Sequence, residues 1–209
     1  MHMADALVSP PVATGMAVAS LAVGAYSIFR IKKENKPENI PVMGVMGAFV
    51  FATQMVNFTI PGTGSSGHLC GGLLLSALIG PYGGFLSMMA ILLLQCLLFA
   101  DGGLMAYGCN AWNMAFYACF FGYFCIYKPI LSKNPSKKKI LIASILGSIL
   151  SLQLGAFSVT LETLISGVTE LPFLTFLSFM QPIHLAIGFV EGLITSAVLI
   201  FVYNTRPEM

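Results

Sequence analysis

The sequence predicts an all-α polytopic membrane protein. Hydrophobic residues make up 57% of its 209 residues and charged residues only 9%, a composition that excludes an ordinary soluble domain. The chain also contains long apolar runs of the kind that cross the ~30 Å hydrocarbon core of a bilayer. These runs lie at 12–29, 41–57, 69–99, 109–127, 140–161 and 173–203. Because no positively charged region precedes the first run, we expect it to remain as a membrane helix and not to be a cleaved signal.

The basic residues predict the topology. All ten fall in three segments: Arg30, Lys32, Lys33 and Lys36; Lys128, Lys133, Lys137, Lys138 and Lys139; and Arg206. The positive-inside rule places all three in the cytoplasm, which requires an even number of spans between the first two. We therefore expect 69–99 to form two short helices turning at Gly80–Gly84, giving seven transmembrane helices with the N-terminus outside and the C-terminus cytoplasmic. Such scattered basic residues do not form a nucleic-acid-binding face.

The first two residues can present three nitrogen atoms to one metal ion. The donors are the α-amino group of Met1, the deprotonated backbone nitrogen of His2 and Nδ1 of the His2 imidazole. A fourth nitrogen would complete a square, the geometry that favours Ni(II) or Cu(II) over the tetrahedral preference of zinc. The alternative is that Met1-His2 is a cloning remnant with no function.

The second candidate ligand is His68. It ends the segment 58–68, which is too glycine-rich to be helical and lies on the same predicted membrane face as the N-terminus. Such irregular backbone is tolerated at membrane depth where it lines a cavity or is buried in protein, so this loop could fold over a bound ion. Gly62 and Gly67 have the spacing of a phosphate loop, but the Lys and Ser or Thr that would follow are absent. The chain is therefore not expected to bind a nucleotide, and an ATPase would have to be another chain.

Three further features leave alternatives open. His184 and Glu191 lie seven residues apart on one face of the last apolar run, where ionisable groups serve either packing networks or transport. The five cysteines form no CxxC pair and read as packing residues, although Cys70 could offer a soft ligand beside His68. The small residues Gly44, Ala48 and Ala52 recur every four positions and predict close helix packing, either within the chain or against another membrane subunit.

The chain resembles the NikM/CbiM family along nearly its whole length. The matching residues are Met1-His2 with Asp5; Ile60-Pro61-Gly62, Ser66-Gly67-His68-Leu69 and Gly71-Gly72; Asp101-Gly102-Gly103-Leu104, Gly108, Asn110 and Asn113-Met114-Ala115; and His184, Ile187-Gly188 and Glu191-Gly192-Leu193-Ile194-Thr195. Several separate motifs in order make this resemblance specific. It also disfavours the cloning-remnant interpretation, which explains nothing beyond His2.

The resemblance implies the substrate-binding S component of an energy-coupling factor transporter for nickel or cobalt. It implies one integral membrane domain over 1–209, in which residues 1–30 form a metal-binding N-terminus and an extra first helix. Residues 41–203 would form a six-helix core whose loop 58–68 covers the metal. Met1, His2 and His68 would hold Ni(II), or Co(II), in a square-planar nitrogen site, and the start resembles nickel-type members more than cobalt-type ones.

The implied partners are a transmembrane T component, two cytoplasmic ATPase subunits and a small membrane accessory subunit, in the lipid of a prokaryotic cell membrane. We expect Asp101, Asn110 and Asn113 to support the ligands, because a coordinating imidazole usually gives its other N–H to an oxygen; His184 is a further candidate for this role. No nucleophile paired with a base is visible, so an enzyme is not expected. The alternative function is a self-sufficient cation channel or secondary transporter that uses His184 and Glu191.

Overall fold

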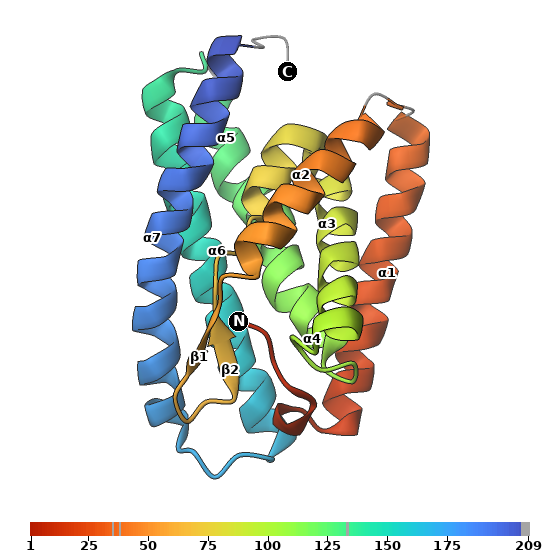
Figure 1. The fold of residues 1–209 in the computed structure, drawn as a ribbon, viewed down its shortest axis with the longest axis vertical. Coiled ribbons are helices and arrows are strands. Elements are labelled where there is room, and N and C mark those ends of the chain that lie inside the picture. The colour runs from red at the N-terminus through yellow and green to blue at the C-terminus, as the bar shows by residue number, and fades with distance from the viewer. Residues whose placement is uncertain (35, 38, 133, 206–209) are drawn as a thin grey trace.

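The computed structural model describes residues 1–34, 36, 37, 39–132 and 134–205. It is a bundle of apolar helices (Figure 1): α1 (Pro10–Glu34), α2 (Asn39–Gln54), α3 (Gly72–Phe99), a continuous helical segment built from α4 (Tyr107–Asn110), η2 (Ala111–Tyr127) and α5 (Lys128–Leu131), α6 (Lys137–Ser166) and α7 (Phe173–Thr205). In the described part of the chain, five helices are long and apolar enough to cross a membrane, and α2 is a shorter apolar helix. An all-α membrane protein is therefore confirmed. Lys133 and Arg206, which also entered the topology prediction, lie outside the described residues.

The α3 helix is interrupted at Gly80. This residue has φ +80° and ψ 160°, which are not helical, and Pro81 follows it; glycine adopts such a positive φ without a steric penalty. In an unbroken helix, Ser76 and Gly84 would be separated by ~12 Å along the axis. Instead, a Cβ atom added to Gly84 would lie 3.0 Å from Cα of Ser76. The two parts of α3 therefore fold back on each other at the first residue of the predicted turn.

A short β-hairpin follows α2. Its strands β1 (Phe58–Ile60) and β2 (Ser65–Gly67) pair antiparallel, with Thr59 opposite Ser66. Gly62 and Gly64 have positive φ in the connecting turn, which explains why this segment is rich in glycine. Met3 forms an isolated bridge with Ser65, so the N-terminal segment lies beside the hairpin as a further extended chain (Figure 1). The sequence predicted a non-helical segment here, but not strands.

The small residues of α2 do not pack inside the chain. Gly44, Ala48 and Ala52 are all exposed, and a Cβ atom added to Gly44 would meet nothing within 4 Å. In contrast, the α6–α7 interface is close: a Cβ atom on Gly192 would lie 2.5 Å from Cα of Ile145. Internal packing of the α2 stripe, one of the two alternatives, is therefore not what the structure shows.

Candidate metal site at the N-terminus

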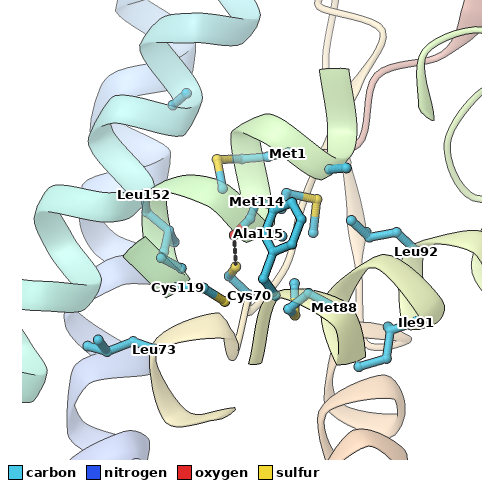
Figure 2. Close-up of a cluster of buried hydrophobic side chains, with 14 of the residues drawn as sticks. Met1, Cys70, Leu73, Met88, Ile91, Leu92, Met114, Ala115, Cys119 and Leu152 are labelled. Carbon is cyan, nitrogen blue, oxygen red and sulfur yellow. Dashed lines mark hydrogen bonds between the residues drawn. The ribbon is translucent and has the colours of Figure 1, made fainter. Parts of the chain in front are cut away.

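The N-terminus is held inside the protein. The Met1 side chain is only 1% exposed and lies in the apolar cluster that contains Met114, Ala115 and Leu152 (Figure 2). Gly155 of α6 leaves room for it, because a Cβ atom there would lie 2.8 Å from Sδ of Met1. The α-amino group donates a hydrogen bond to the carbonyl oxygen of Ser66 in β2. The thioether thus anchors the terminus and places its amino group at the hairpin.

The His2 ring has one nitrogen whose lone pair is free to bind a metal ion. Its Nε2 lies 3.1 Å from Oε1 of Gln95; because this oxygen can only accept, Nε2 carries the hydrogen and Nδ1 keeps a lone pair. Nδ1 lies 3.2 Å from Oδ1 of Asp101 but has no hydrogen-bond partner among the residues that the structure describes. Burial and the neighbouring Met1 ammonium lower the pKa of His2 from 6.5 to about 3, so at neutral pH this contact is not an ion pair. Two lone-pair-bearing atoms facing each other form an arrangement that a bound cation would stabilise.

His68 is arranged in the same way. Its Nδ1 lies 2.7 Å from the carbonyl oxygen of Leu69, which assigns the hydrogen to Nδ1 and a lone pair to Nε2. That Nε2 lies 3.3 Å from the Met1 nitrogen, and the His68 ring stacks on the His2 ring with centroids 4.5 Å apart. Burial lowers the pKa of His68 well below its ordinary value, with smaller contributions from the Met1 ammonium, His2 and His184.

The site is therefore a set of neutral nitrogen donors. Burial lowers the pKa of the Met1 α-amino group from 8.0 to about 5, so the amine and both imidazoles are unprotonated at pH 7. Within the part of the chain that the structure describes, no cluster of three or more His, Cys, Asp or Glu side chains could hold a metal. The nitrogens of Met1, His2 and His68 form a different kind of set, because one of them is an amino terminus. The arrangement suits a cation that prefers nitrogen ligands.

The two imidazole rings contact groups that were not named from the sequence. Gln95 lies within hydrogen-bond distance of Nε2 of His2, and the Leu69 carbonyl lies within hydrogen-bond distance of Nδ1 of His68. Asp101 instead faces the free Nδ1 of His2 and accepts a hydrogen bond from Asn57 at 2.7 Å. A polar residue inside the apolar run of α3 was the available signal for Gln95, since such groups usually have a partner or a task.

Asn110 and Asn113 contact Met3, which follows Met1 and His2. Oδ1 of Asn110 accepts from the Met3 amide at 2.7 Å and its Nδ2 donates to the Met3 carbonyl at 3.2 Å. Asn113 donates to Glu162 at 2.7 Å and contacts Sδ of Met3 at 3.7 Å. Asn110 therefore fixes the backbone of Met3 next to His2, and Asn113 ties this segment to α6.

His184 and Glu191 do not contact each other in a relay. Nδ1 of His184 lies 2.8 Å from the Met180 carbonyl, one turn earlier in α7, and its buried Nε2 has no hydrogen-bond partner in the described part of the chain. Glu191 accepts hydrogen bonds from the backbone amides of Cys70 and Gly71. The Cys70 thiol donates to the Met114 carbonyl and burial raises its pKa well above the ordinary value, which favours the packing role for this residue.

The whole chain is similar to known metal transport proteins. The family model described as the cobalt uptake substrate-specific transmembrane region, CbiM, matches residues 2–209. A putative fused nickel transport protein, NikMN, from Archaeoglobus fulgidus is 36% identical over 209 residues, covering 100% of this chain and 68% of that protein. A cobalt transport protein, CbiM, from Acetoanaerobium sticklandii is 32% identical over 216 residues, covering 100% of this chain and 85% of that protein.

The fold agrees with these sequence matches. The crystal structure of a truncated transition metal transporter superposes with a TM-score of 0.89 at 29% identity, covering 98% of this chain and 99% of that chain. A probable fused nickel transport protein, LarMN, from Lactiplantibacillus plantarum is 32% identical, covering 99% of this chain and 66% of that protein. The chain thus spans about two thirds of the length of the fused proteins that it matches.

Proposed function

The chain belongs to the CbiM family of metal-uptake membrane proteins, and we propose that it is the substrate-binding S component of an energy-coupling factor transporter for nickel. The observation that carries this proposal is the convergence of the Met1 amine, His2 and His68, whose hydrogen bonds leave unprotonated nitrogens at one place. With the backbone nitrogen of His2, they supply four nitrogens to a square-planar Ni(II) ion. Co(II) is the alternative substrate, since family members are named for both metals.

The positions of the helix ends and of the hairpin support an orientation in the membrane. We propose seven spans, counting the two parts of α3 separately, as the reversal at Gly80 supports. The basic C-terminal end of α1 and the end of α7 lie opposite the hairpin (Figure 1). The hairpin and the N-terminus therefore face the outside of a prokaryotic cell membrane, where the substrate arrives.

Transport would depend on other subunits. The segment with phosphate-loop spacing forms the hairpin beside the metal site, so we assign ATP hydrolysis to two separate cytoplasmic ATPase subunits. The exposed stripe of Gly44, Ala48 and Ala52 on α2 allows close approach of a further membrane helix, as a T component would require. The fused relatives are longer than this chain, and a small membrane accessory subunit is the remaining partner in the proposed complex.

Titration of the purified protein in detergent with Ni(II) and Co(II) tests this function. We expect one Ni(II) per chain with the absorption spectrum and diamagnetism of a square-planar ion. Replacing His68 with Ala should lower nickel affinity by about 100-fold or more, because losing a ligand costs more than the 10–100-fold typical of an outer-shell partner. Equal affinity in the wild type and H68A would contradict the site. Robust uptake by cells that express only this chain would favour the channel or secondary transporter instead.

Gln95 should increase the nickel affinity of the site although it is not itself a ligand. Replacing it with Leu removes the oxygen that holds the hydrogen on Nε2 of His2, so part of the population would carry it on Nδ1. We expect nickel affinity to fall about 10–100-fold, measured by calorimetric titration. Gln153→Leu, which removes a side chain that bonds the Gln181 backbone between α6 and α7, is the matched control and should bind nickel like the wild type. Comparable losses in both variants would indicate a general packing effect.

Nickel affinity should weaken as the pH falls. Because the pKa of the Met1 amine is about 5 and that of His2 about 3, these groups are already unprotonated at pH 7. Binding there should release about one proton, from the His2 backbone amide, so affinity should fall about tenfold per pH unit. Below about pH 5 the amine also takes up a proton and the slope steepens. Calorimetry in buffers of different ionisation enthalpy measures this number, and release of two protons at pH 7 would contradict the burial argument.

A further inference from the structure

Glu191 connects the last helix to the loop that carries His68. It lies on α7 and is 3% exposed. One carboxylate oxygen accepts from the Cys70 amide at 2.5 Å and the other accepts from the Gly71 amide at 3.1 Å. Both oxygens are therefore used by backbone groups that lie about 120 positions earlier in the chain and only two and three residues after His68.

The loop between His68 and α3 is fixed on several sides. The carbonyl oxygen of Cys70 accepts from Gln54 of α2 at 2.5 Å, and its thiol donates to the Met114 carbonyl at 3.1 Å. Gly71 has φ +76° and packs so closely on Val50 that a Cβ atom would lie 2.7 Å from Cγ1. Glu191 accepts from both of these amides, and no other acceptor for them is found among the described residues.

This fixation bears directly on the donor nitrogen of His68. The ring orientation of His68 depends on the Leu69 carbonyl, which accepts from Nδ1 at 2.7 Å, and Leu69 immediately precedes Cys70. If the Cys70 and Gly71 amides move, Leu69 moves with them and Nε2 turns away from the Met1 nitrogen, 3.3 Å distant. Outer groups that orient a ligand in this way contribute to metal affinity without touching the ion.

We propose that Glu191 is a positioning residue for the metal site, holding the 68–71 loop so that Nε2 of His68 meets the other nitrogens and linking the site to α7. The inference rests on the proposed function, because it requires His68 to be a ligand. It replaces the relay as the role of Glu191, whose two oxygens are both engaged by the loop.

A double-mutant cycle on the full chain tests this role. Glu191→Gln keeps the size of the side chain but presents only one acceptor to two amides, and should weaken Ni(II) binding about 10–100-fold. Its nickel spectrum should shift toward that of H68A, since the fourth nitrogen is displaced. In an H68A background, the same substitution should change affinity by about twofold or less, because interacting residues are not additive. Gln181→Ala, which removes a side-chain bond from α7 to the Gln153 backbone, is the control and should bind like the wild type.

The outcomes separate the two proposals. Absence of nickel binding by the wild type, or unchanged binding by H68A, would remove the proposed function itself. Wild-type affinity in E191Q, with H68A impaired, would overturn only the role of Glu191. A loss in E191Q that adds fully to that of H68A would also overturn it, because the residue would then act elsewhere. Should E191Q fail to fold, Glu191→Asp keeps both oxygens on a shorter stem and should give an intermediate loss that is again absent in the H68A background.

Discussion

A four-residue extension in front of Met1 is expected to abolish high-affinity nickel binding. The Met1 amine is buried, donates to the Ser66 carbonyl and lies 3.3 Å from Nε2 of His68. An extension would replace this amine with an amide, which must lose a proton before it can bind a metal ion. The added residues would also have no space in the buried site. We expect a loss of more than about 100-fold, greater than that caused by removing an outer-shell partner. Calorimetric titration of the extended and native proteins measures it.

The length and position of the extension provide the controls. The same four residues added after Met209 should leave affinity unchanged. A single added residue is not equivalent, because it would place the histidine third from the new amino group, where the terminus alone offers four nitrogens. Full nickel affinity in the four-residue variant would show that the amine is not a ligand.

Replacing Gly155 with Ala should destabilise both the helix packing and the site. A Cβ atom there would collide with the Asn113 carbonyl of η2 and lie 2.8 Å from Sδ of Met1. Overpacking of this kind typically costs about 1–3 kcal/mol. Because the displaced Met1 carries the donor amine, we also expect nickel affinity to fall about tenfold or more, as for a displaced supporting group.

Thermal unfolding of the metal-free protein and nickel titration measure the two effects separately. Gly15→Ala on α1 is the matched control, because a Cβ atom there would meet nothing within 4 Å and alanine favours helix. A G155A protein with native stability and native affinity would contradict the anchoring of Met1.

The helices were largely predictable because apolar length is a strong signal. The run at 173–203 corresponds to α7 at Phe173–Thr205, and that at 12–29 lies within α1 at Pro10–Glu34. Charge placement also located the reversal in α3, where Gly80 leaves the helical conformation. The hairpin was missed because its strands have only three residues each, which is too short for an alternating pattern to be visible.

The proposed nitrogen ligands could be named from the sequence, but the groups that contact them could not. Chelation by consecutive residues is a property of the local chain, so Met1 and His2 could be proposed as ligands without knowledge of the fold, and the predicted topology added His68. Gln95 and Glu191 could not be assigned, because their partners lie 93 and about 120 positions away and depend on how α3 and α7 pack. The burial of the Met1 side chain was likewise not predicted, because the space that its thioether fills is left by Gly155 in a distant helix.

The anchoring of Met1 also has a consequence for the order in which the protein assembles. Met1 packs against Gly155 in α6, and its amine contacts residues 65 and 67 positions away. Contacts between residues so far apart in the sequence form late, after other packing has offset the entropic cost of closing the intervening loop. The N-terminus can therefore reach its buried position only after α6 has been inserted. Nascent chains that end before α6 should lack the pocket for the thioether, and nickel binding would report completion of the bundle.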